Sequence, residues 1–516
     1  MLRHIPLFVS FILIFVNGIS DSIHAQTITN SLVYYMENDG IQVHAADRHA
    51  GEGYLLSGEI SISGFVAVTD EDGNPGLVKG ITDHIISDII HEADSGFTTV
   101  GYRQTGSNIL NLMRWNAQAD TLWTMNLELN RVWYPRLKRL ANQDYLISAT
   151  TITEASEPAP LMLRVSPQGA ILWSKIYKPT SNEPAYAYSA AELPDGNLLI
   201  TGHTASPGNY KVLLIQTDAQ GNPLLSRTFA FQNAYYNACY DVVQGEEGIT
   251  LLCAAEYDIA LMRIGFDLNP LWSKTFRSNF YSYFNGFLGN LIRNADGSLL
   301  LAGSGDWGNF IKTDSEGIPE YMLDAYMYMA DVVPSEDGGA MLFGNGPLIG
   351  VKAFPGYYPQ IGVYRCDSLG EGSSCVGKST PFFEEAETDS EDIQFTAYPA
   401  GTLHSNPLSF FDLEFLTEAA CVSFIGNARN NATESGQIQA YPNPAGTWFS
   451  LDLTQELREK FSRLDIISSG GQIVYKTFDP STAAGAIPCS HLPAGIYMIR
   501  ITAGDKNYTG KISIQH

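Results

Sequence analysis

Tyrosine and tryptophan side chains recur in short clusters along the 516-residue chain. The clusters are "VWYP", "AYAY", "AYYN", "FYSYF" and "AYMYM". They supply the candidate ligand-binding residues Trp133, Tyr134, Tyr186, Tyr188, Tyr235, Tyr236, Tyr281, Tyr283, Tyr326 and Tyr328. Aromatic rings can stack on sugar rings or anchor a protein partner, so the pattern favours a binding site for a polysaccharide or a protein. The alternative is that repeated strands bury these rings as ordinary packing residues.

Residues that could catalyse a reaction or hold a metal ion form no recognisable pattern. The 10 His are scattered, and no His/Cys/Asp cluster has the spacing of metal ligands. The chain has no GxSxG nucleophile motif. "DEDGN" from Asp70 resembles the start of a calcium loop, but Ile81 stands where that loop needs Glu, so an acidic hairpin turn is favoured. We therefore expect no catalytic residue, metal or cofactor, and we expect a binding protein rather than an enzyme.

The aromatic clusters lie between copies of a repeated unit. Equivalent turn residues, 46 to 53 positions apart, are Asp70, Asn116, Ser166, Asp218, Gly265, Asp314 and Asp367. A second turn, typified by "PDGN" and "ADGS", recurs in step with the first. Each unit therefore holds about four short strands, and a period of ~40 to 50 residues is typical of propeller blades. The sequence predicts an all-β chain with a seven-bladed β-propeller over residues 26–370.

Two features predict how the blades connect. "LWSK", at 172–175 and 271–274, lies on the outermost strand, where Trp173 and Trp272 would pack between neighbouring blades. The last unit lacks an outer strand, and "TITNSLVYYM" at 27–36 has the composition of one. We expect this segment to complete the last blade. The aromatic clusters, which join one blade to the next, should then converge on one face around the axis.

The N-terminus and the charge limit where the chain functions. Residues 1–25 read as a secretory signal peptide, with Arg3, an apolar run over 6–16 and the small residue Ala25. The run is shorter than the ~20 residues of a membrane span, so we expect no transmembrane segment in the mature chain. With 30 Lys+Arg against 55 Asp+Glu, the formal charge of -25 argues against a nucleic-acid partner.

Export would permit disulfide bonds, and two cysteine pairs are candidates. Cys239 and Cys253 flank the turn "GEEG" symmetrically, so a hairpin would set them opposite each other. They would then form either a disulfide or two buried free thiols. Cys366 and Cys375 would close a short loop.

The C-terminal part of the chain has a different pattern. Strands alternate with Gly-rich turns over residues 437–516, which predicts a small immunoglobulin-like β-sandwich. The ordered motifs "YPNPA", "GGQIVY", "LPAGIY" and "GKISI" resemble the type A C-terminal sorting domain of the type IX secretion system. The residues that carry this resemblance are Tyr441, Pro442, Asn443, Pro444, Gly471, Gly495, Tyr497 and Lys511. The resemblance implies the type IX secretion machinery as partner and a secreted or surface-attached product.

Between these two parts, residues 371–436 are rich in acidic residues and in Asn, Ser and Gly. This composition predicts a linker or an extension that packs on the propeller. The preferred interpretation of the whole chain is a secreted or cell-surface binding module for a polysaccharide or an extracellular protein. The alternatives are an extracellular glycan hydrolase or lyase with carboxylates on propeller loops, and a structural surface protein with no soluble ligand.

Overall fold

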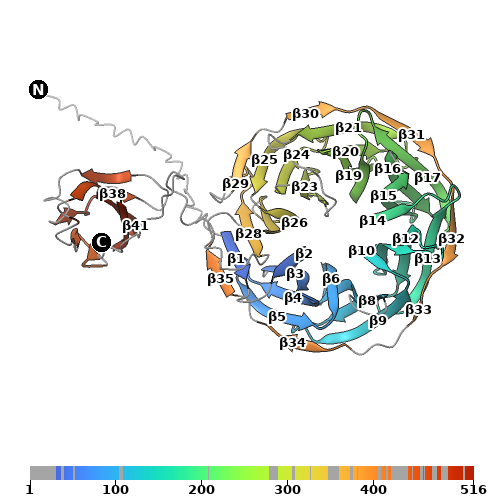
Figure 1. Cartoon of the computed structure of the whole chain (residues 1–516), viewed down its shortest axis with the longest axis horizontal. Coiled ribbons are helices and arrows are strands. Elements are labelled where there is room, and N and C mark those ends of the chain that lie inside the picture. Colours follow the sequence, from blue (N-terminus) through green and yellow to red (C-terminus); the bar gives the residue numbers. More distant parts are fainter. Residues whose placement is uncertain are drawn as a thin grey trace, which may run out of the picture. The chain divides into compact units, whose positions relative to one another are not determined.

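The computed structural model divides into two compact units, residues 1–422 and 423–516. It describes residues 31–35, 40–49, 53–103, 108–206, 209–277, 289–304, 308–325, 327–336, 338–346, 360–371, 376–379, 382–403, 408–413, 416–419, 440–443, 445–451, 453, 457, 460–467, 473–477, 486–503 and 506–515. The predicted signal peptide lies outside these residues. In the first unit, seven five-stranded antiparallel sheets are arranged in a ring (Figure 1).

We number the sheets I to VII around the ring and give the strands of each from the inner edge outward. Sheet I contains β2 (Ile41–His49), β3 (Gly53–Ile60), β4 (Ser63–Thr69), β5 (Pro75–Ile81) and β34 (Phe410–Asp412). Sheet II contains β6 (His84–His91), β7 (Phe97–Arg103), β8 (Asn108–Trp115), β9 (Thr121–Leu129) and β33 (Thr402–Leu403). Sheet III contains β10 (Val132–Arg139), β11 (Tyr145–Ile152), β12 (Pro158–Val165), β13 (Ile171–Pro179) and β32 (Phe395–Pro399). Sheet IV contains β14 (Ala185–Glu192), β15 (Leu198–Ser206), β16 (Asn209–Thr217), β17 (Pro223–Phe231) and β31 (Thr388–Asp392).

The remaining three sheets complete the ring. Sheet V contains β18 (Asn237–Gln244), β19 (Ile249–Ala255), β20 (Asp258–Ile264), β21 (Pro270–Arg277) and β30 (Phe382–Glu385). Sheet VI contains β22 (Asn290–Arg293), β23 (Leu299–Ser304), β24 (Gly308–Thr313), β25 (Pro319–Ala325) and β29 (Val376–Ser379). Sheet VII contains β26 (Tyr328–Pro334), β27 (Ala340–Asn345), β28 (Ile361–Cys366), β1 (Ser31–Tyr35) and β35 (Leu416–Ala419).

The repeated turn found in the sequence follows the third strand of each sheet. In sheet IV the amide of Asp218 donates to the carbonyl of Asn222 (2.9 Å), and the amide of Gly221 donates back to Asp218 (2.9 Å). The Asp218 carboxylate also accepts the amides of Gln220 (2.9 Å) and Asn222 (2.8 Å). Backbone bonds of the same pattern recur at the six equivalent positions, so each sheet has one such turn, and successive turns are 46 to 53 residues apart.

The N-terminal strand closes the ring, as predicted. One edge of β1 pairs with β28, from Ser31↔Tyr364 to Tyr34↔Ile361. Its other edge pairs with β35, from Leu32↔Ala419 to Tyr35↔Leu416. Sheet VII is therefore built from segments that are far apart in sequence, and β1 has no free edge.

Residues 376–419 form a belt that supplies the outermost strand of every sheet. Strands β29 to β35 visit the sheets in the order VI, V, IV, III, II, I and VII, and they lie on the rim of the ring (Figure 1). The described residues of this stretch therefore pair with the sheets as strands, as an extension that packs on the ring would. Composition alone does not reveal such strands, because an edge strand is held by backbone hydrogen bonds and does not need an apolar sequence.

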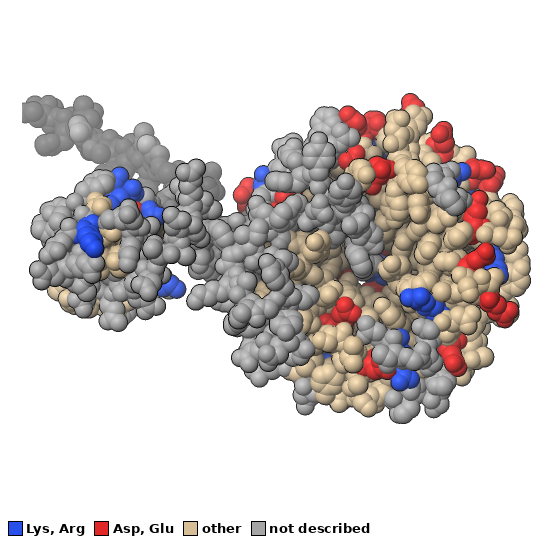
Figure 2. Space-filling view, in the orientation of Figure 1, with Lys and Arg blue, Asp and Glu red and all other residues tan. Residues whose placement is uncertain are grey.

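Side chains of the second "LWSK" segment, residues 271–274, contact both the neighbouring sheet and the belt. A Cβ added to Gly317, in the turn of sheet VI, would lie 2.7 Å from the Trp272 ring of sheet V, so tryptophan and turn are in close contact. Ser273 donates to the carbonyl of Ala386 in the belt (2.5 Å), and Lys274 pairs with Glu385 (3.3 Å). The acidic side chains of the belt contribute to those seen along the rim in Figure 2.

Cysteine residues on β18 and β19 face each other as the hairpin pattern predicted. Cys239 and Cys253 are register partners and are fully buried. Both are free thiols, and so is Cys366, so a disulfide at any of these three positions is not present in the structure. Each thiol packs as a small apolar side chain, and Cys239 contacts the Asp241 carbonyl (3.5 Å). Cys375 lies outside the described residues.

The second unit consists of two small sheets around one core. One contains β36 (Ala440–Tyr441), β37 (Trp448–Leu451) and β40 (Ile487–Pro488). The other contains β39 (Ile473–Thr477), β38 (Phe461–Ile467), β41 (Gly495–Ala503) and β42 (Lys506–Ile514). Phe449 and Ile487 of the first sheet share a buried cluster with Leu464 and Ile499 of the second.

Candidate ligand-binding site

A continuous group of aromatic rings spans sheets III, IV and V, and we call it the aromatic surface. Its members are Tyr134, Tyr186, Tyr188, His203, Tyr210, Tyr235, Tyr236 and Tyr240. The ring of Tyr188 lies 5.3 Å from Tyr134 and 4.9 Å from Tyr240, between centroids. Tyr186 stacks on His203 at 4.7 Å with an interplanar angle of 4°. These contacts join three sheets into one site.

Irregularities in the inner strands turn these rings toward each other. β10 has a register shift between Trp133 and Arg136, and Tyr134 within it adopts a left-handed φ of 55°. That conformation is unfavourable for a bulky residue and is found mainly where packing or function requires it. β14 and β18 have shifts that leave out Tyr188 and Tyr240, so both rings lie at bulges.

The loop that carries Tyr235 and Tyr236 is fixed by hydrogen bonds. The Glu256 carboxylate accepts the amides of Tyr235 (2.6 Å) and Tyr236 (3.0 Å). The fully buried Asn237 donates to the carbonyls of Tyr210 (2.9 Å) and Ala234 (3.1 Å). The exposed rings are therefore held in place before a ligand arrives, which lowers the entropic cost of binding.

The aromatic surface has a buried floor and an accessible top. Tyr188, His203 and Tyr240 are buried, while Tyr134, Tyr186, Tyr210 and Tyr236 are half-buried. Tyr235 is 56% exposed. Burial lowers the pKa of His203 to about 3 and raises the pKa of Tyr186 and Tyr236, so these groups are neutral near pH 7. An uncharged aromatic surface suits an uncharged ligand.

The structure brings together five of the ten predicted aromatic residues: Tyr134, Tyr186, Tyr188, Tyr235 and Tyr236. Trp133 stacks instead with Arg131, whose guanidinium carbon lies 4.5 Å from the ring centroid. Tyr328 is 51% exposed in sheet VII, and no ring contact between described residues joins it to the aromatic surface. Tyr281, Tyr283 and Tyr326 lie outside the described residues. Tyr188 is buried, so ordinary packing accounts for part of the pattern.

Sequence reasoning missed His203, Tyr210 and Tyr240. His203 and Tyr210 come from the β15–β16 hairpin, whereas the sequence search considered only the connections between blades. The β15–β16 hairpin reaches the same site as those connections, so "GHTASPGNY" was the available signal.

Carboxylates on the inner strands join one sheet to the next. Asp88, Asp241 and Asp331 each follow the bulge of their strand directly. They accept backbone amides from the next sheet, in the contacts Leu137 to Asp88 (2.8 Å), Leu291 to Asp241 (2.9 Å) and Ala46 to Asp331 (2.7 Å). Burial raises the pKa of Asp88 and raises the pKa of Asp331 to about 7. These carboxylates thus have a structural use.

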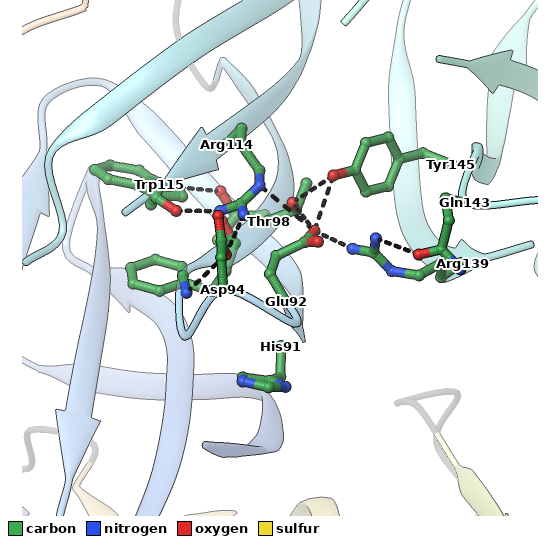
Figure 3. Close-up of polar contacts among 12 residues, drawn as sticks. His91, Glu92, Asp94, Thr98, Arg114, Trp115, Arg139, Gln143 and Tyr145 are labelled. Atoms are coloured by element: carbon green, nitrogen blue, oxygen red, sulfur yellow. Dashed lines mark hydrogen bonds and ion pairs between the residues drawn. The ribbon is translucent and has the colours of Figure 1, made fainter. Parts of the chain in front are cut away.

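A second buried charge network joins sheets II and III (Figure 3). The Glu92 carboxylate accepts the hydroxyl of Tyr145 (2.8 Å) and that of Thr98, and it pairs with the guanidinium of Arg139. Arg114 Nε lies 3.8 Å from the same carboxylate. Because two cations and two hydroxyls surround Glu92, we assign this network to stability. Among the described residues, no three His, Cys, Asp or Glu side chains are grouped so that they could hold a metal ion.

In the second unit, the motif residues at the C-terminus have defined contacts. Asn443 Oδ1 accepts the amide of Ser513 (2.9 Å), and its Nδ2 donates to the carbonyl of Lys511 (3.2 Å). Tyr497 is buried and donates to the carbonyl of Pro493 (2.8 Å). Gly495 begins β41, whereas Tyr441 and Pro442 are exposed. Pro444 and Gly471 lie outside the described residues.

Residues 439–515 match the family model described as "Secretion system C-terminal sorting domain". This part of the chain is a type IX secretion sorting domain. The sorting domain makes the chain a secreted or cell-surface protein that engages the type IX machinery, as the sequence motifs predicted. The described residues contain no helix that is long and apolar enough to cross a membrane.

Comparison with curated proteins gave no match. Solved structures similar to the chain include a protein of unknown function from Bacteroides caccae, with 11% identity over 60% of this chain and 99% of that one (TM-score 0.31). Chaetomium thermophilum Polycomb Repressive Complex 2 bound to GSK126 has 10% identity over 66% and 98% (TM-score 0.44). The GH43_1 enzyme from Xanthomonas citri complexed with xylose has 10% identity over 56% and 88% (TM-score 0.27). All three TM-scores are low, so these likenesses carry no argument about function.

Proposed function

We propose that this chain is a secreted or cell-surface binding module whose ring recognises a polysaccharide or an extracellular protein through the aromatic surface. In this proposal the ring is a seven-bladed β-propeller closed by β1, and the sorting domain is an immunoglobulin-like sandwich. The supporting observation is the chain of ring contacts from Tyr134 to Tyr235 across three sheets, with several rings open to solvent. Rigid, half-exposed aromatic groups are typical binding anchors.

A polysaccharide fits this surface better than a charged partner. Burial lowers the pKa of His203 to about 3 and raises the pKa of Tyr186 and Tyr236, so these three rings carry no charge near pH 7. A sugar ring can stack on a tyrosine, and its hydroxyls can bond to the phenol groups at the rim of that tyrosine.

The test is retention of the full-length chain on immobilised neutral and acidic polysaccharides and on extracellular matrix proteins. The double variant Tyr186→Ala/Tyr236→Ala should lose about tenfold or more in affinity, since each stacked ring contributes on the order of 1 kcal/mol. Tyr398→Ala is the matched control, because Tyr398 is 49% exposed on the belt, away from the aromatic surface. Unchanged retention of a folded double variant would rule out this site.

The same assay separates the other interpretations. A glycan hydrolase or lyase would release new sugar ends into the supernatant, whereas a binding module would retain the polymer intact. The axial carboxylates Asp88, Asp241 and Asp331 already accept backbone amides, so this geometry favours binding over hydrolysis. Absence of both retention and product would favour a structural surface protein.

A further inference from the structure

The inner strands line a half-open cavity of about 190 Å³ on the axis of the ring. Its wall includes Asp88, Arg136, Ser189, Asp241, Asn290 and Asp331, from six different sheets. Drug-sized ligands occupy pockets of roughly 300–1,000 Å³, so this cavity has room for a smaller molecule.

Arg136 lacks a partner inside this cavity. Its side chain lines the wall, and the residue is only 8% exposed. Among the described residues, none is within hydrogen-bond or ion-pair distance of its guanidinium. Burial raises the pKa of Asp88 and of Asp331, and the positive charge of Arg136 opposes that rise, so the guanidinium lies in the field of both carboxylates without bonding to either. A guanidinium has five N–H donors, and those of Arg136 face the cavity and can donate to a bound molecule.

The wall of the cavity offers hydrogen-bond acceptors as well as donors. Both carboxylate oxygens of Asp88, and Oδ2 of Asp241 and of Asp331, accept one hydrogen bond each and keep a second lone pair. Oδ1 of Asp241 is already bound by Ser189 and Lys138, and Oδ1 of Asp331 by Asn290 and the amide of Val332. Lys138 adds a donor, with its ammonium 3.5 Å from Asp241.

Four acidic residues line the cavity, counting Asp47, against the two cations Arg136 and Lys138. Burial raises the pKa of Asp47, Asp88 and Asp331, so the lining has no excess of positive charge that would attract an anion.

We propose that the axial cavity binds one neutral sugar unit, with Arg136 donating to its oxygen atoms and the aspartates accepting its hydroxyls. Along β14 and β18, Tyr188 and Tyr240 of the aromatic surface directly precede the wall residues Ser189 and Asp241. The cavity thus adjoins the floor of that surface, and a sugar chain stacked there can place its terminal unit on the axis. The placement of the attached chain rests on the proposed function.

The experiment is binding of neutral monosaccharides to the full-length chain, measured by saturation-transfer NMR and calorimetry. The compounds are glucose, galactose, mannose and xylose, with inorganic phosphate as the anionic contrast. We expect at least one sugar to bind and phosphate not to bind. Arg136→Met should weaken sugar binding about tenfold or more, because charge-assisted hydrogen bonds are the strong ones. Arg131→Met is the matched control, since Arg131 stacks on Trp133 and does not line the cavity.

A second measurement keeps the inference testable if Arg136→Met does not fold. Hydrogen exchange on the wild-type chain should slow at the wall amides of residues 136–138, 241 and 290–292 when sugar is added. Binding of no sugar, binding of phosphate instead, or sugar binding without protection of these amides would overturn the inference.

The experiments test the aromatic surface and the axial cavity independently. If polymer retention depends on Tyr186 and Tyr236 but no monosaccharide binds, the aromatic site stands and the cavity site is wrong. If a monosaccharide binds and depends on Arg136 but no polymer is retained, the cavity site stands and the proposed function is wrong.

Discussion

At the scale of single residues, the ring contains acidic groups whose burial is balanced in two different ways. Glu92 is 5% exposed and is surrounded by two arginines and two hydroxyls. Asp331 instead accepts backbone amides, and burial raises its pKa to about 7. Loss of charge should therefore have opposite effects at the two positions.

Glu92→Gln should destabilise the first unit by roughly 3–5 kcal/mol, because it leaves Arg114 and Arg139 without their shared carboxylate in a buried site. Urea unfolding followed by circular dichroism measures this loss. Glu154→Gln, at an exposed turn position, is the control and should change the free energy of unfolding by less than about 0.5 kcal/mol. Equal stability of the two variants would contradict the structural role of the network.

Asp331 should make stability depend on pH. Its pKa is about 7 in the folded chain and about 4 when unfolded, so between these values the folded state holds the extra proton. The contribution of Asp331 is therefore greatest below pH ~4 and declines by roughly 4 kcal/mol as the pH rises to ~7.

The measurement is the difference in free energy of unfolding between wild type and Asp331→Asn across this range. The subtraction cancels histidines such as His44 and His203, whose lowered pKa values give the opposite slope. A difference that does not vary with pH would show that Asp331 ionises normally.

At the scale of elements, the glycine in four of the repeated turns meets a bulky aromatic residue of the preceding sheet: Gly169, Gly221, Gly317 and Gly370. Gly221 has a φ of 74°, and an added Cβ would lie 2.9 Å from the Trp173 ring. Gly196 has a similar φ of 80°, but an added Cβ would meet nothing within 4 Å. Alanine substitutions at Gly196 and Gly221 therefore separate two contributions to the free energy of unfolding: the left-handed backbone and the contact between sheets.

Gly196→Ala should cost about 1–2 kcal/mol, from the left-handed backbone alone. Gly221→Ala should cost about 1–3 kcal/mol more, because its new methyl group displaces Trp173. Thermal and urea unfolding of both variants measure the difference. Equal losses would mean that the tryptophan adjusts freely and does not bind the sheets together.

Much of the ring could be predicted at this scale from sequence spacing. Hydrogen bonds within a few residues of each other specify the turns at Asp218 and its equivalents, so the repeat is visible in one chain. The pairing of β1 with β28 could also be predicted, because one unit lacked a strand. The belt could not be assigned to particular sheets, because its partners are distant in sequence and its contacts are largely backbone bonds.

Contacts between residues that are distant in sequence also limit how much of the aromatic surface could be predicted. The tyrosine clusters indicate an aromatic face, but the contacts of Tyr188 with His203 and Tyr240 depend on bulges and on neighbouring sheets. The lone Arg136 has no sequence signature, since its burial arises only when the inner strands meet on the axis.

At the scale of the whole molecule, the belt ties all seven sheets into one folding unit. Its contacts include the ion pairs Lys211–Glu391 (2.6 Å) and Arg227–Asp392 (2.9 Å) as well as the strand pairings. Without it, every sheet would present an open edge to solvent.

A chain that stops at residue 370 should therefore be much less stable than one that stops at residue 436, although both contain every unit of the repeat. We expect a lower melting temperature and concentration-dependent aggregation for the shorter chain, measured by scanning calorimetry and light scattering. The chain ending at residue 436 controls for loss of the sorting domain. Equal melting temperatures would show that the belt is dispensable.

The position of β1 between β28 and β35 also sets an order of events during export. A chain that emerges with its N-terminus first delivers β1 early, yet both neighbours of this strand come from beyond residue 360. In such a chain the ring stays open at one seam until β28 and β35 have emerged and can pair with β1. The sorting domain follows the last strand of the ring in the sequence, so it emerges only after the strands that close the ring have emerged.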